Sequence, residues 1–181
     1  MQNGRVQPQT RGLTAQDEKF RRWLLEQAEQ HGNAIVQVAG GGEHGEDYAP
    51  YAFTVGAWRR YGVAEAVVVG LPAEMSTVLL NAYVHRASLG ERFRAGTVYD
   101  GFFEGVPVAF EQVDRAWYPE YLGSAFLLYA KGDFAALQII VPTPQGNWPW
   151  DDDAPAGFRA WQPVLTRSGR PESWTPGVDG P

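Results

Sequence analysis

The segment NWPWDDD at residues 147–153 combines two residue types that often bind ligands. Trp148 and Trp150 could form the aromatic walls of a site, and the aspartates at 151–153 could offer oxygen ligands to a cation. A calcium loop needs acceptors spaced over about 12 residues with its own Gly and Glu, and that pattern is absent. Because Pro149 stiffens the turn, we expect the tryptophans to fold back over the sheet edge or a helix. One aspartate is expected to cap a turn while the others face solvent.

A glycine-rich stretch, GGGEHGED at residues 40–47, contains one histidine and three acids. His44 could act as a general base or join the acids around a metal ion. The spacing matches no metal signature, and a glycine-rich loop is a poor scaffold for a preorganised site. The stretch also lacks the Lys-Ser/Thr pair of a phosphate-binding loop. We therefore interpret it as a solvated loop, keep His44 as a catalytic candidate, and predict no metal site.

Three tyrosines and one arginine are further candidates for a ligand-binding or catalytic role. Tyr118, Tyr121 and Tyr129 recur near helical spacing. The hydroxyls of Tyr118 and Tyr121 could meet at a shared rim, or the tyrosines could form a core stripe with satisfied hydroxyls. Arg59, in an expected turn between strands, could bind a carboxylate or phosphate through two parallel hydrogen bonds. No serine stands in a G-x-S-x-G elbow, which argues against an α/β-hydrolase.

Hydrophobic periodicity defines the elements that must position these residues. It predicts helices over 14–31, about 72–89 and about 117–130. It predicts strands over 34–38, 51–56, 64–71 and 134–142, and two more within 97–113. Strand pairs without intervening helices favour an α+β fold over a doubly wound sheet. We expect one α+β domain over 14–165, with a mixed, mostly antiparallel sheet of five to six strands and about three helices. Residues 1–13 are expected to form a flexible arm and 166–181 a Gly/Pro-rich tail.

Composition narrows the classes of function. The 181 residues are 44% hydrophobic, enough for a core, and carry a net charge of −6, which disfavours nucleic acid as a partner. The chain has no cysteine, which excludes disulfides and a thiol nucleophile and is compatible with a reducing compartment. No signal peptide or membrane-length apolar run is apparent. We expect a soluble, cytoplasmic protein.

Several motifs occur together in one order: YAFTVG, VVVGLP, YPEYLG, GNWPW and WQPV. In this combination the chain, over about 20–165, resembles the bacterial family catalogued as domain of unknown function 4262 (DUF4262). It departs from the family at Val63-Ala64, where members often have His-Pro or Arg-Pro, and in its longer insert at 40–47. The resemblance implies no activity or cofactor. It places eight residues at motif positions: Phe53, Thr54, Gly56, Glu65, Asn81, Gln138, Trp150 and Gln162.

Thr54, Glu65 and Gln138 are polar residues within apolar strands, and burying them is costly unless they are hydrogen-bonded or used. If they converge near Trp150, they would form a pocket. We favour a non-enzymatic protein-interaction or small-ligand-binding module of immunity or adaptor type, with a basic protein or a small molecule as partner and no cofactor. The alternatives are a small enzyme using Glu65, Tyr121 and Gln138, with Trp150 as a lid, or a flavin-type cofactor binder. The expected ligand-binding residues are Thr54, Gln138, Trp148, Trp150 and Arg59.

Overall fold

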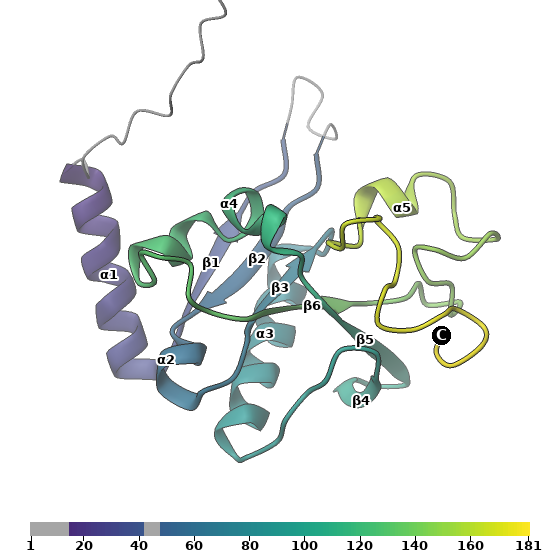
Figure 1. Ribbon diagram of the computed structural model, residues 1–181, viewed down its shortest axis with the longest axis horizontal. Helices are drawn as coiled ribbons and strands as arrows, with labels where there is room; N and C mark the ends of the chain where they lie inside the picture. Colours follow the sequence, from purple (N-terminus) through teal and green to yellow (C-terminus); the bar gives the residue numbers. More distant parts are fainter. Residues whose placement is uncertain (1–14, 42–47) are drawn as a thin grey trace, which may run out of the picture.

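A six-stranded sheet forms the centre of the protein, in the order β1-β2-β3-β6-β5-β4 (Figure 1). The computed structural model describes residues 15–41 and 48–181. Its strands are β1 (Ala34–Val38), β2 (Tyr51–Val55), β3 (Glu65–Val69), β4 (Val98–Phe103), β5 (Val106–Gln112) and β6 (Ala136–Ile140). Neighbouring strands are antiparallel except β3 and β6, which are parallel. The predicted α+β class and mixed, mostly antiparallel sheet are confirmed.

The helices are α1 (Ala15–His31), α2 (Ala57–Tyr61), α3 (Ala73–Ser88), α4 (Tyr118–Tyr121) and α5 (Phe158–Trp161). Two 3-10 turns, η1 (Arg115–Trp117) and η2 (Gly123–Leu127), flank α4. The single helix predicted over 117–130 is therefore wrong. Leu122 leaves helical geometry at φ −130° and ψ 25°, and Gly123, a weak helix former, follows it. The turn predicted after β2 is also wrong, because its residues form α2.

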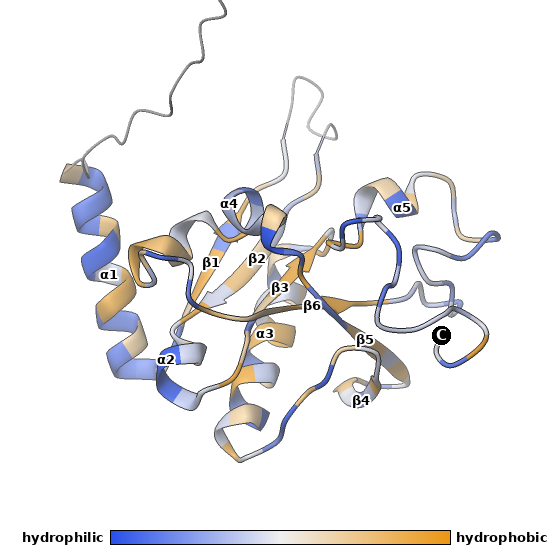
Figure 2. Ribbon diagram, viewed as in Figure 1, coloured by the Kyte–Doolittle hydropathy of each residue, from blue (hydrophilic) through white to orange (hydrophobic). Residues whose placement is uncertain are grey.

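Both faces of the sheet are covered, and β3 is buried along its whole length. Successive strand side chains point to opposite faces, so Val67 and Val69 belong to one core cluster and Ala66 and Val68 to another. The first cluster lies under α1 and the α4 region, and the second lies under α3. Figure 2 shows much of β3 in apolar colours, whereas α1 is largely hydrophilic. No helix in the described part of the chain is long and apolar enough to cross a membrane.

The chain after β6 lies against the sheet although it contains little regular structure (Figure 1). Gln138 accepts a hydrogen bond from the Leu165 amide at 2.8 Å and donates one to the Pro163 carbonyl at 2.7 Å. Gln162 bonds both main-chain groups of Val141, at 3.1 and 2.7 Å. Within the segment predicted as a tail, Trp174 is only 5% exposed. Residues 166–181 thus contribute to the packed structure.

We predict that Trp174→Ala lowers the free energy of unfolding by about 3–5 kcal/mol, because it removes a large side chain from the cluster around Trp150. Urea denaturation followed by circular dichroism measures the change. Val178→Ala is the matched control in the same segment. Val178 is 80% exposed, so this variant should stay within about 0.5 kcal/mol of the wild type. Equal stabilities for the two variants would show that the segment adds nothing to the core.

Candidate functional site

The carboxylate of Glu65 is completely buried at the start of β3. It accepts five hydrogen bonds of 2.7–3.3 Å, from the amides of Gly56, Ala57 and Trp58 and the hydroxyls of Thr54 and Tyr129. The first amides of a helix have no partner within the helix, and here Glu65 supplies one for the start of α2. Both oxygens of the carboxylate accept hydrogen bonds from the surrounding protein, so Glu65 serves as an internal anchor.

Gly56 makes this arrangement possible because its backbone has φ +114°, a conformation that other residues rarely adopt. A Cβ atom there would lie 3.0 Å from the Cβ of Ala28 on α1. The residue therefore provides both the turn from β2 into α2 and the close approach of α1.

Burial raises the pKa of Glu65, while the hydrogen bonds from Tyr129, Gly56, Thr54 and Trp58 lower it. Burial also raises the pKa of Tyr129, and the neighbouring charge of Glu65 raises it further. The Tyr129 hydroxyl donates to Glu65 and accepts from the Arg59 amide at 3.2 Å. Tyr129 therefore occupies the place beside Glu65 that the enzyme hypothesis gave to Tyr121.

The polar motif residues separate into two groups. Thr54 and Glu65 are in direct contact at 2.9 Å. Gln138 instead holds the segment after α5, and Trp150 donates its indole N–H to the main-chain oxygen of Pro181 at 3.1 Å. The structure therefore does not gather the four residues into a common pocket.

The Trp148-Pro149-Trp150 turn folds back over the sheet. Its two indoles stack with centroids 5.4 Å apart and an interplanar angle of 7°. Trp174 packs edge-on against Trp150, and all three indoles are buried in a cluster with Ala109 and Ile140. The stacked pair is thus part of the core rather than an open platform for a flavin.

The side chains of the remaining candidates that the structure describes make no hydrogen bond to Glu65. Arg59 is exposed, and its guanidinium makes no ion pair with any described residue. Asp151 accepts a hydrogen bond from the Trp148 amide at 2.7 Å, which closes the turn, whereas Asp152 and Asp153 are exposed. His44 lies outside the described residues. Over 15–41 and 48–181, no group of three or more His, Cys, Asp or Glu side chains is placed to hold a metal ion.

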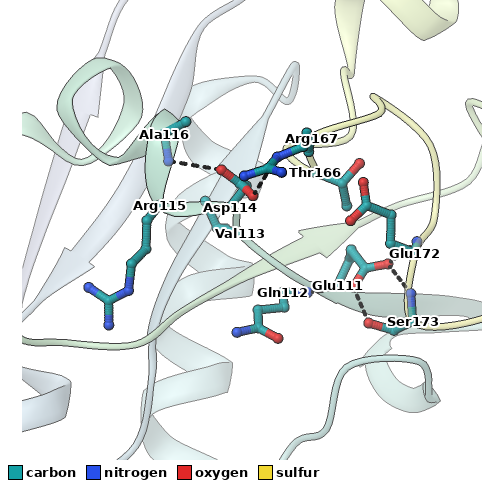
Figure 3. A pocket seen from close by; sticks show the side chains of 10 residues that line it. All are labelled: Glu111, Gln112, Val113, Asp114, Arg115, Ala116, Thr166, Arg167, Glu172 and Ser173. Carbon is teal, nitrogen blue, oxygen red and sulfur yellow. Dashed lines mark hydrogen bonds and ion pairs between the residues drawn. The ribbon is translucent and has the colours of Figure 1, made fainter.

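A polar cavity of about 660 Å³ lies where β5 ends and the C-terminal segment crosses it (Figure 3). Glu111 accepts hydrogen bonds there from the amides of Glu172 and Ser173 and from the Ser173 hydroxyl. Asp114 accepts from the Ala116 amide at 3.0 Å and faces Arg167 at 4.0 Å. Glu111 and Asp114 thus fasten loops together, and we interpret this cavity as an anchor for the C-terminal segment.

A second cavity, of about 320 Å³, lies at the ends of β1 and β3 and is lined by tyrosines. The rings of Tyr51 and Tyr121 meet edge-on with centroids 5.0 Å apart, and Tyr48, 61% exposed, forms another part of the wall. The Tyr51 hydroxyl donates to the main-chain oxygen of Glu120 at 3.1 Å. The carboxylate of Glu120 and the hydroxyls of Tyr48 and Tyr121 have no hydrogen-bond or ion-pair partner among the residues described.

Burial and the charge of Glu120 together set the electrostatics of the tyrosine cavity. Burial raises the pKa of Tyr51 and of Tyr121, and the charge of Glu120 raises both further. The hydroxyls therefore remain protonated at neutral pH, and the cavity combines aromatic rings with one negative charge. Sequence analysis identified Tyr121 but missed Tyr48, Tyr51 and Glu120. Glu120 adjoins Tyr121 in the chain, but the proximity of Tyr51 depends on tertiary contacts.

Comparison with known proteins establishes the family of the chain. Residues 27–155 match the family described as Domain of unknown function (DUF4262), and the protein belongs to this family. Neither the search of curated proteins nor the search of solved structures finds a match. The matched residues include Glu65 and the cavity residues Tyr48, Tyr51, Glu120 and Tyr121.

We predict that Glu65→Gln destabilises the fold by about 2–4 kcal/mol, because the amide group turns an N–H toward main-chain donors and leaves at least one buried group unpaired. Urea denaturation at neutral pH measures the loss. Glu104→Gln, in the exposed turn between β4 and β5, is the matched control and should be close to neutral. A fully stable Glu65→Gln variant would contradict the anchoring role.

We also predict a pH signature for Tyr129. Its raised pKa means that the folded protein keeps the phenolic proton where the unfolded chain loses it, so stability falls as the pH rises above about 10. Tyr129→Phe should be less stable at neutral pH by about 1.5–3 kcal/mol, because a hydrogen bond to a charged group is lost. Its stability should then fall less steeply above that pH, as measured by urea denaturation at a series of pH values. Parallel pH curves for the two proteins would contradict the assignment.

Proposed function

We propose that the protein is a non-enzymatic binding module that recognises a cationic group, carried by a basic protein partner or a small molecule, in the tyrosine cavity. The observation that carries this proposal is the unpaired carboxylate of Glu120 beside the rings of Tyr48, Tyr51 and Tyr121. The face of an aromatic ring attracts a cation within about 6 Å of its centroid, and a nearby carboxylate adds a direct charge interaction.

The overall charge supports the same class of partner. The net charge of −6 favours the approach of positively charged molecules and opposes that of anions. The cysteine-free composition is compatible with action in a bacterial cytoplasm, where we place the protein.

The enzymatic alternative has less support. A general base must come within hydrogen-bond reach of the proton that it removes. Glu65 is 0% exposed and already accepts five hydrogen bonds, so a substrate could reach it only by displacing α2 or Tyr129. Tyr121 does line a cavity, but its contacts are with Tyr51 and Trp117 rather than with Glu65.

The proposal predicts selective binding of side-chain cations. In an NMR titration of the full chain, Nα-acetyl-lysine amide and Nα-acetyl-arginine amide should shift the amide signals of Val69, Glu120 and Tyr121. Nα-acetyl-norleucine amide, which has an apolar side chain without the charge, should shift them far less. Glu120→Gln should weaken binding of the cations about 3- to 10-fold, and higher ionic strength should weaken it for the wild type.

Glu104→Gln is the control for a change of overall charge at an exposed position away from the cavity, and it should retain wild-type affinity. Equal binding of the norleucine and lysine probes would overturn cation recognition. Shifts confined to another surface would overturn the assignment to this cavity.

A further inference from the structure

A groove between α1, β1 and α3 has a different chemical character from the tyrosine cavity. Its volume is about 320 Å³. Trp23, Gln27 and His31 are spaced four residues apart on α1 and therefore form one ridge along the helix. Asn33 immediately precedes β1 and Ile35 is the second residue of that strand, while Asn81 comes from α3.

Most polar side chains of this groove have no hydrogen-bond partner in the described chain and can bind a ligand. Asn33 donates a long hydrogen bond of 3.4 Å to the Ala34 carbonyl. Within the described chain, the side chains of Trp23, Gln27, His31 and Asn81 make no hydrogen bond. An amide group offers two donors and an oxygen acceptor, so three amides can bind groups that both donate and accept.

Trp23 adds an apolar surface to these amides. Trp23 is 40% exposed, and its indole stacks on Phe20 with ring centroids 5.6 Å apart and an interplanar angle of 20°. The contact with Phe20 holds the ring in one orientation. A tryptophan at a partly exposed position presents an apolar body together with one N–H donor.

The groove offers a ligand no permanently charged side chain, and His31 is its only ionisable one. None of its six lining residues is Lys, Arg, Asp or Glu. A phosphate or carboxylate would find no guanidinium or ammonium group to bind, and a cation would find no carboxylate. The kind of ligand that suits these residues is a neutral one with an apolar face and many hydroxyl groups.

We infer that this groove is a saccharide-binding site. A pyranose ring carries C–H groups on one face, which pack on the Trp23 indole, and hydroxyls on its edge, which bind the amides of Gln27, Asn33 and Asn81. The volume lies near the lower end of small-ligand sites, as expected for one or two sugar rings. The groove shares no residue with the tyrosine cavity and lies at the opposite end of β1, so it is independent of the proposed cation site.

Saturation-transfer NMR on the full chain tests this inference, with glucose, galactose, N-acetylglucosamine and cellobiose as probes. At least one should receive magnetisation at its ring C–H protons. Trp23→Ala should abolish the transfer, and Asn81→Ala should weaken binding about tenfold, since it removes a hydrogen-bonding group from an exposed position that folding does not need.

Two controls separate the sites. His85→Ala, one turn beyond Asn81 on α3 and outside the groove lining, should bind the saccharide as the wild type does. Glu120→Gln should also leave saccharide binding unchanged while it weakens the cation probes. The inference is overturned if none of the four saccharides shows transfer, or if transfer persists unchanged in both Trp23→Ala and Asn81→Ala.

Discussion

The buried carboxylate of Glu65 is the interaction on which the rest of the structure depends. Removing a carboxylate from water costs several kcal/mol unless hydrogen bonds replace the lost hydration. Five donors do so here, and they come from three separate parts of the chain: the end of β2, the start of α2 and the segment after η2. Because these donors must all reach one pair of oxygens, the carboxylate fixes the relative positions of their segments. Tyr129 then packs on Phe134 at 5.0 Å, which connects the anchor to the aromatic core.

The same principle explains the other polar residues of the central strands. The chain after β6 is rich in Gly and Pro and forms no extended ladder with the sheet, yet its main-chain groups still need partners. The side chains of Gln138, Gln162 and Glu111 provide them. Gln138 and Glu111 lie opposite each other on β6 and β5, so these two side chains, which hold the C-terminal segment, are cross-strand neighbours. In these apolar strands, a polar residue therefore marks a place where its side chain binds the main chain of another segment and holds that segment against the sheet.

The sequence predicted the elements better than their contacts. The periodic patterns of α1 and α3, the alternation of β2 and the unbroken apolar run of β3 were sufficient, because each pattern follows locally from the faces that the element buries. The single helix predicted over 117–130 was wrong, because its apolar residues follow a helical period although the backbone leaves helical geometry at Leu122. The need of Glu65 for partners was predictable from its type, but the choice of Tyr129 over Tyr121 depends on a contact across 64 residues. The tyrosine cavity was only partly predictable for the same reason, since β2 and α4 are brought together by the whole fold.

The distribution of polar groups also determines where ligand binding can occur. Among the described residues, no buried side-chain polar atom lacks a hydrogen-bond partner, so the interior holds no free group that awaits a substrate. Available polar groups are concentrated at the surface, and two such places lie at opposite ends of β1. One contains a carboxylate among tyrosines, and the other contains amides beside a tryptophan. Charge interactions fall off over about 10 Å at moderate salt, whereas neutral hydrogen bonds require contact, so each place can select its own class of ligand with little influence from the other.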